Sequence, residues 1–478
     1  MSWTANCGFK RTGSDLAGGA PALGPESSRG LASHIFAAWM RSLSGGKSHA
    51  QRPRRGRRGQ RPRRAWSPIS LGHFRSATRH IASFFLSLAT LGLFAQTPSA
   101  STNVWHSLAT GRDLTASLIE PEGGGTDKTP PLVIYLKNLA SPRAGTESDD
   151  SILAGLRREG CRVAILDYAG HPQARTPFLN RDLGKLRDDL KARAFLAQYK
   201  PDDAHIFILP AGSRLARNVV FYRDSARALA MDVIYPSKPA SPAGAVIEFS
   251  CDNQDRMGNA SLSICSDTLL DAAATEGFAT AMADHTVAAP YKGLDPMPEC
   301  AWKIKAAVRT LRAEGVQWGL NGKIVPVGFS RGSGMALMLA TTDGLAEFEG
   351  RGEHTNASSS VQGAVVMSGR FTYLDLLPQD KMWPRYAQAW GPLTNNREVW
   401  KRQGALDYMT RPVVPLFLTI NCSESPEALH QMTVLRKRLA ELGNDEMFFM
   451  DPEPRGHKVT LAPEILDAMN RYLTARLR

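Results

Sequence analysis

A serine framed by two glycines lies about two-thirds of the way along the chain, in Gly328-Phe-Ser-Arg-Gly332. Glycines two before and two after a serine remove side chains that would collide in a very tight turn between a strand and a helix. An apolar run precedes the turn, and an apolar helical stretch, Met335 to Ala340, follows it. The pattern predicts a nucleophile elbow that presents Ser330 for attack on a carbonyl carbon.

A serine hydroxyl is a poor nucleophile near neutral pH, so it needs a base, and the base needs a carboxylate to orient it. His457 is the candidate base because it lies in a Pro/Gly-rich segment between an expected strand and the last helix. A solvated histidine without a catalytic role is the alternative. Glu424 is the candidate acid because it follows the expected strand 414–420. A carboxylate that only stabilises the next helix dipole, as expected for Glu427, is the alternative for Glu424 as well.

Negative charge that develops on the substrate oxygen requires two backbone N–H donors. The elbow supplies one of them from Arg331, at the start of the following helix. The second is expected from the loop after the strand 245–249, where Ser250 and Cys251 are the candidates. This loop, 250–254, contains no glycine.

Short apolar runs alternate with amphipathic stretches from residue 105 onward, which predicts an α/β fold with a mostly parallel sheet. In the second half, strands are expected at 229–235, 244–249, 278–284, 323–327, 361–367, 414–420 and 446–450, and helices at 268–275, 298–314, 426–443 and 463–477. The aromatic-rich segment 371–409 is expected to shape a substrate pocket or to form an ordinary helical cover.

The region 105–220 shows a similar order of elements and is a possible degenerate copy of the second half. Strands are expected there at 114–119, 131–136, 161–168 and 204–209, and helices at 151–159 and 182–198. Where the elbow would fall, the first region has Pro210-Ala-Gly-Ser-Arg214, without the glycine frame. We therefore expect Ser213 to lie in a turn and to have no nucleophilic role. A loose similarity between any two α/β stretches is the alternative.

The net charge of +13 comes entirely from the N-terminal part of the sequence. Residues 1–80 hold 15 Lys/Arg and 2 Asp/Glu, whereas residues 81–478 hold 43 of each sign. We expect residues 1–74 to be a disordered basic extension, because the segment 52–64 has no apolar periodicity. The next methionine after Met40 is Met231, so we expect this extension to result from a mis-assigned start. An arm that binds nucleic acid is the alternative, and no nucleic-acid partner is expected.

A basic stretch, a short apolar core and small polar residues follow one another in residues 75–101, which predicts a signal peptide and a secreted or periplasmic protein. No stable membrane partner is expected unless this signal is an uncleaved anchor. The six cysteines show no CxxC pair and no Cys/His spacing typical of zinc, so no metal and no cofactor are expected. Cys251 and Cys265 form a candidate disulfide in an exported protein, with buried thiols as the alternative.

Serine, then glutamate, then histidine is the chain order of the α/β-hydrolase superfamily. Residues 225–478 resemble its esterase/lipase members, close to the hormone-sensitive-lipase-like, acetyl-xylan and feruloyl esterase groups. Arg455-Gly-His457 is similar to their closing histidine loop, and Ala306 to Arg312 to the helix before their elbow. The chain departs from the His-Gly-Gly type of oxyanion loop, since Phe249 to Asn253 contains no glycine, and its acid is Glu instead of the commoner Asp.

The resemblance implies a catalytic domain at 225–478 that hydrolyses carboxylic esters through Ser330, His457, Glu424 and an acyl-enzyme. Its substrate would be a small-molecule or carbohydrate-linked ester. Two alternatives stay open: a serine peptidase of the prolyl-oligopeptidase type, which shares the triad order, and a non-catalytic binding protein with a hydrolase fold. No regular repeats of a β-propeller precede the domain, which favours the esterase over the peptidase.

Overall fold

The computed structural model describes residues 102–107, 110–123, 130–139, 145–169, 206–223, 228–239, 241–249, 273–284, 297–459 and 461–478. The predicted basic extension and signal peptide, the helix expected at 182–198, Ser250, Cys251 and Cys265 lie outside these residues. Within the described part, no helix is both long enough and apolar enough to cross a membrane.

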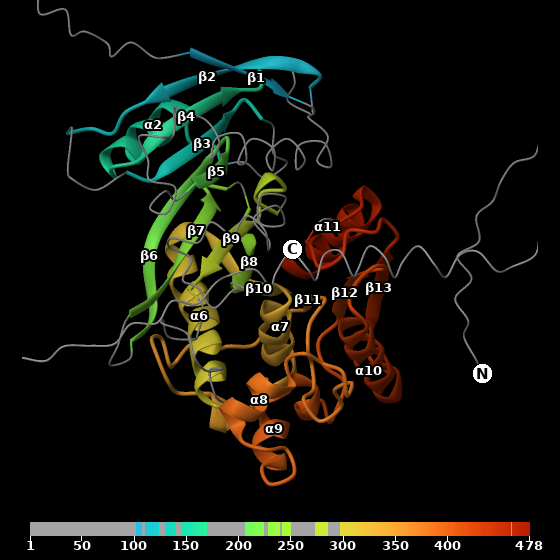
Figure 1. Ribbon diagram of the computed structural model, residues 1–478. Helices are drawn as coiled ribbons and strands as arrows, with labels where there is room; N and C mark the ends of the chain where they lie inside the picture. The colour runs from blue at the N-terminus through green and yellow to red at the C-terminus, as the bar shows by residue number, and fades with distance from the viewer. Residues whose placement is uncertain are drawn as a thin grey trace, which may run out of the picture. The chain divides into compact units, whose positions relative to one another are not determined.

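An eight-stranded, mostly parallel sheet dominates the described part of the chain (Figure 1), with the strand order β13-β12-β11-β10-β8-β9-β7-β6. The neighbours β8, β10, β11, β12 and β13 run parallel to one another, whereas β7 is antiparallel to both β6 and β9. The strands are β6 (Ser213–Arg223), β7 (Ala228–Pro236), β8 (Ala243–Phe249), β9 (Ala279–Ala283), β10 (Leu320–Phe329), β11 (Ala364–Met367), β12 (Leu416–Asn421) and β13 (Glu446–Asp451).

Helices cover both faces of this sheet, so its central strands are apolar on both sides. Three helices, α6 (Glu299–Gly315), α7 (Arg331–Thr341) and α10 (Pro426–Leu442), share one hydrophobic core with Ile247 and Phe249 of β8. The last helix, α11 (Pro463–Leu477), packs on the other face, where Val246 of β8 joins its core. The alternation of successive β8 side chains between the two cores follows from the two-residue period of a strand.

A second, five-stranded sheet is built from the first half, in the order β1-β2-β4-β3-β5. Its parallel strands β3, β4 and β5 follow an α/β pattern, while β1 and β2 are antiparallel additions at one edge. Its elements are β1 (Thr102–Ser107), β2 (Arg112–Ile119), β3 (Leu132–Lys137), α2 (Asp149–Arg158), β4 (Arg162–Asp167) and β5 (Ile206–Pro210).

The predicted α/β class and the mostly parallel sheet are confirmed. The strand β6 was not predicted, and the prediction that Ser213 lies in a turn is wrong, because Ser213 begins β6 and the turn is formed by Ala211 and Gly212. Two register shifts in the pairing of β6 with β7 interrupt the two-residue alternation, so the sequence shows no clear strand period. β6 precedes residue 225, the predicted start of the catalytic domain.

Candidate active site

The turn between β10 and α7 places Ser330 at the carboxyl end of the sheet. Ser330 has φ 54° and ψ −117°, a backbone conformation that costs a non-glycine residue on the order of 1–3 kcal/mol. Its two framing glycines permit the turn: a Cβ on Gly328 would lie 2.1 Å from the carbonyl oxygen of Gly332, and a Cβ on Gly332 would lie 2.7 Å from that of Phe249. The predicted strand, tight turn and helix are thus present around Ser330.

The structure brings the three predicted side chains together, although they come from distant parts of the sequence. The Nε2 atom of His457 lies 3.0 Å from the Oγ atom of Ser330. On the other side of the ring, Nδ1 lies 2.8 Å from Oε2 of Glu424. With Nδ1 as the donor to the carboxylate, Nε2 is left free to accept the proton of the serine hydroxyl.

Glu424, between β12 and α10, is buried and accepts several hydrogen bonds. Its side chain is 2% exposed. Ser368 donates a hydrogen bond to Oε2 at 2.6 Å, and the backbone N–H of Ser425 donates to Oε1 at 2.9 Å. Burial alone would raise the pKa of Glu424, but the hydrogen bonds from His457, Ser368 and Ser425 outweigh burial and hold the pKa below its usual value. The carboxylate is therefore charged near neutral pH.

A second polar residue, Asn421, joins the loop of the acid to the loop of the histidine. Its Oδ1 accepts hydrogen bonds from the backbone N–H groups of Ser423 and Arg455, and its Nδ2 donates to the carbonyl oxygen of Glu453. The Ser423 hydroxyl then accepts from the N–H of Gly456 at 2.8 Å. These bonds fix the chain directly before His457.

The ring of His457 also packs on the ring of Phe329, the residue before Ser330, with the two centroids 4.5 Å apart. One face of the imidazole is thereby held, while the side chain as a whole is 50% exposed. His457 is thus anchored by its neighbours and is still accessible from solution.

The predicted oxyanion donors are only partly described. Arg331 is the first residue of α7, so its backbone N–H lies in the first turn of that helix, next to Ser330. The carbonyl oxygen of Phe249 approaches Gly332 closely, which brings the end of β8 against the elbow. The loop with Ser250 and Cys251 follows β8 directly, but both residues lie outside the described part.

The aromatic-rich segment after β11 forms the short helices α8 (Trp383–Trp390) and α9 (Arg397–Gln403). Tyr386, Trp390 and Trp400 form the core of a separate aromatic cluster. Arg370, three residues after β11, donates two hydrogen bonds to the buried carboxylate of Asp380 at 2.9 and 2.8 Å. This ion pair and the aromatic rings stabilise the segment that contains α8 and α9.

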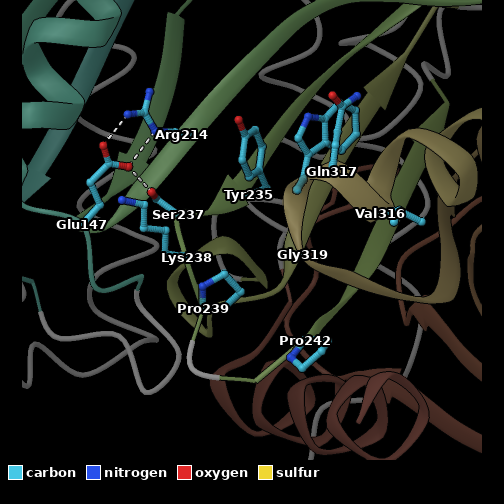
Figure 2. Close-up of a pocket in the computed structure, with 11 residues that line it drawn as sticks. Glu147, Arg214, Tyr235, Ser237, Lys238, Pro239, Pro242, Val316, Gln317 and Gly319 are labelled. Atoms are coloured by element: carbon cyan, nitrogen blue, oxygen red, sulfur yellow. Dashed lines mark hydrogen bonds and ion pairs between the residues drawn. The ribbon is translucent and has the colours of Figure 1, made fainter.

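A cavity of about 610 Å³ lies at the other end of the eight-stranded sheet from Ser330, near the amino end of β10. Trp318 and Gly319 line it just before β10 begins, whereas Ser330 follows the other end of this ten-residue strand. At the usual rise per residue, β10 separates the two places by roughly 30 Å. Figure 2 shows Arg214 and Ser237 directed at the Glu147 carboxylate in this cavity. The cavity is therefore not part of the site around Ser330.

Two polar residues that hold the site in place, Ser368 and Asn421, were not singled out from the sequence. Ser368 precedes Glu424 by 56 positions, and an isolated serine after an apolar strand carries no local signal of that contact. Asn421 stands three residues before Glu424 at the end of a strand and was a detectable candidate. Among the described residues, no group of three or more His, Cys, Asp or Glu side chains is arranged to hold a metal ion.

Comparison with known protein families identifies the central part of the chain. Residues 231–432 match the family BD-FAE, an esterase domain of the α/β-hydrolase type. The matched part includes Ser330 and Glu424, and His457 follows it. This part of the chain is a carboxylesterase-like enzyme domain.

Several solved structures are similar to this chain, and each similarity covers 55% of the length of this chain. One is a truncated carbohydrate esterase from gut microbiota, with 16% identity, a TM-score of 0.47 and 95% of that protein covered. Another is the butyrate-bound esterase Est2 of Thermogutta terrifontis, with 16% identity, a TM-score of 0.44 and 94% covered. A third is the bifunctional GH43-CE protein of Bacteroides eggerthii, with 17% identity, a TM-score of 0.47 and 38% covered. No curated protein matches the chain.

Proposed function

We propose that this protein hydrolyses carboxylic esters with Ser330 as the nucleophile, His457 as the general base and Glu424 as the carboxylate that orients the histidine. The observation that carries the proposal is the continuous chain of hydrogen bonds from Ser330 through both nitrogens of His457 to Glu424. A surface histidine without a role would not need both a buried carboxylate and a strained serine as its neighbours.

The reaction would begin when Nε2 of His457 takes the proton of the Ser330 hydroxyl while Oγ attacks the ester carbonyl carbon. The Glu424 carboxylate stabilises the imidazolium that forms. The N–H of Arg331 stabilises the negative oxygen of the tetrahedral intermediate. Collapse of this intermediate breaks the ester C–O bond, and His457 returns its proton to the departing alcohol. A water molecule, deprotonated by the same histidine, then releases the carboxylic acid from the acyl-enzyme.

A small-molecule or carbohydrate-linked ester is the substrate class we propose, following the resemblance to acetyl-xylan and feruloyl esterases. The half-exposed side chain of His457 supports this choice, because an ester attached to a larger molecule can reach it from solution. The predicted signal peptide at 75–101 leads us to propose further that the enzyme works after export, in the periplasm or outside the cell.

Turnover of matched ester and amide substrates tests this proposal. We expect the purified protein to hydrolyse p-nitrophenyl acetate and butyrate and to leave the corresponding p-nitroanilides and prolyl peptides intact. Cleavage of the amides at a comparable rate would favour a peptidase of the prolyl-oligopeptidase type. No turnover of any ester by the folded protein would favour the non-catalytic binding protein.

A further inference from the structure

Ser368 adopts a backbone conformation that serine normally avoids. It directly follows β11 and has φ 44°, in the left-handed region that favours glycine, and its side chain is buried. A glycine at this position would remove the strain, and the next residue is in fact Gly369. Residues held in such conformations cluster at functional sites, so we infer that the side chain of Ser368 has a function that glycine could not fulfil.

The hydroxyl of Ser368 forms a hydrogen bond with the carboxylate of Glu424. It donates to Oε2 of Glu424 at 2.6 Å, and the same oxygen accepts the hydrogen bond of His457 at 2.8 Å. The other oxygen, Oε1, is held by the N–H of Ser425. Together these donors leave the carboxylate one orientation, with Oε2 facing the imidazole. Ser368, directly after β11, therefore supplies the second side-chain hydrogen bond to this oxygen.

The turn formed by Ser368 and Gly369 also contacts the backbone of Ser330. The carbonyl oxygen of Met367 accepts the backbone N–H of Ser330 at 3.0 Å. A Cβ on Gly369 would lie 1.9 Å from the hydroxyl of Ser333 and 2.8 Å from the carbonyl oxygen of Ser330, so this position admits only glycine. The Ser368–Gly369 turn therefore contacts both the elbow and the acid, and it sets their separation.

We propose that Ser368 is a positioning residue of the triad, whose hydroxyl holds the Glu424 carboxylate in the orientation that receives Nδ1–H of His457. This inference rests on the function proposed above. It implies that the strain at Ser368 is retained because only a hydroxyl on this turn reaches Oε2.

Removal of the hydroxyl has a consequence that depends on pH. Without this donor the pKa of Glu424 rises, because one of the hydrogen bonds that offset its burial is lost. The protonated acid cannot stabilise the imidazolium that forms during the reaction, so activity falls more at low pH than at high pH. Among the described groups that affect the pKa of Glu424, His457 is the one titratable neighbour.

Two substitutions separate positioning from a structural role: Ser368→Ala removes the hydroxyl and keeps the strain, and Ser368→Gly removes both. We expect each variant to lose about 10- to 100-fold in kcat for p-nitrophenyl acetate, the usual effect of losing a hydrogen bond to a charged group, with KM nearly unchanged. The loss should be larger at pH 5.5 than at pH 8. The Gly variant should nevertheless unfold at a temperature at least as high as that of the Ala variant, because it is free of strain.

Ser359→Ala is the matched control, because Ser359 is also a buried serine that donates to a carboxylate, that of Glu349, outside the site. It should lower the unfolding temperature and leave kcat and its pH dependence unchanged. The inference is overturned if Ser368→Gly retains wild-type kcat at both pH values. A loss that is the same at both pH values contradicts the expected effect of the Ser368 hydroxyl on the protonation of Glu424.

Failure of the proposed function gives a different result. If Ser330→Ala retains ester hydrolysis, the function and the inference both fail. If Ser330→Ala is inactive and the Ser368 variants behave like the wild type, only the inference fails.

Discussion

Two carboxylates at opposite edges of the eight-stranded sheet are held in similar ways and have different partners. Glu424 and Glu147 are both largely buried, and each accepts a hydrogen bond from a serine hydroxyl, of Ser368 and Ser237 respectively. Glu147 is paired with Arg214, whose Nε lies 2.7 Å from Oε2, whereas Glu424 is paired with a histidine. Arginine keeps its charge at all accessible pH values, but histidine gains and loses a proton near neutrality.

The partner therefore decides what each carboxylate can do. Glu147 and Arg214 form a permanent ion pair between the segment before α2 and the start of β6, which links the five-stranded sheet to the eight-stranded one. The hydrogen bonds from Arg214 outweigh burial and hold the pKa of Glu147 far below its usual value. In the function proposed above, the Glu424 carboxylate instead orients a histidine that passes a proton to and from Ser330.

The largest expected effect is the loss of ester hydrolysis in the variant Ser330→Ala. Loss of the nucleophile should reduce kcat/KM for p-nitrophenyl acetate by about 10³-fold or more, because what remains is catalysis by binding and by the oxyanion donors alone. The unfolding temperature should not fall, since the substitution removes one oxygen atom from a strained turn. Steady-state kinetics and thermal unfolding measure the two sides of this prediction, and retained turnover would locate the nucleophile elsewhere.

The substitution Glu424→Gln keeps the size of the side chain and removes its charge. We expect a loss of about 10²- to 10⁴-fold in kcat, because an amide can no longer stabilise the imidazolium and favours the wrong tautomer of His457. Initial rates at saturating substrate measure this loss. A Gln variant with more than a tenth of the wild-type kcat would mean that Glu424 has no such role.

At the opposite edge, Glu147→Gln should affect stability instead of activity. The free energy of unfolding should fall by about 2 kcal/mol, less than for a fully buried pair, because the Arg214 side chain is 29% exposed. Urea denaturation measures this difference. The kcat of the folded variant should equal that of the wild type, and a large loss of kcat would show that the two edges are coupled.

The smallest effect is a dependence of that stability difference on pH. The folded-state pKa of Glu147 is lowered, so its contribution is fully present above the unfolded value of about 4.3 and is lost as pH falls towards the folded-state pKa. The difference between wild type and Glu147→Gln should be constant from pH 5 to pH 7 and should shrink at pH 3. Thermal unfolding at these pH values tests this, and a difference that grows at pH 3 would contradict it.

Local sequence signals were sufficient for the elbow and for most strands. The glycine frame of Ser330 reflects contacts within one turn, and the helix expected at 463–477 has the bounds of α11. The chain order of Ser330, Glu424 and His457 predicted that Glu424 and His457 lie on loops after later strands, and they follow β12 and β13.

The remaining features depend on contacts between distant residues. The hydroxyl of Ser368 reaches an acid 56 positions later, and the strain that marks Ser368 is a property of the folded backbone. Glu147 and Arg214 are 67 positions apart, the first in the segment before α2 and the second in β6, so neither stands out in its local sequence. The bulged strand β6 escaped prediction because register shifts disturb the two-residue period.

Reaction with a fluorophosphonate probe, followed by mass spectrometry of the digested protein, tests the central claim most directly. Such a probe forms a stable adduct with a serine only when a base activates it. We expect a single adduct on the peptide that contains Ser330, and its loss in His457→Ala while the variant remains folded. An unlabelled Ser330 in the folded wild-type protein, or an adduct on another serine, would contradict the account.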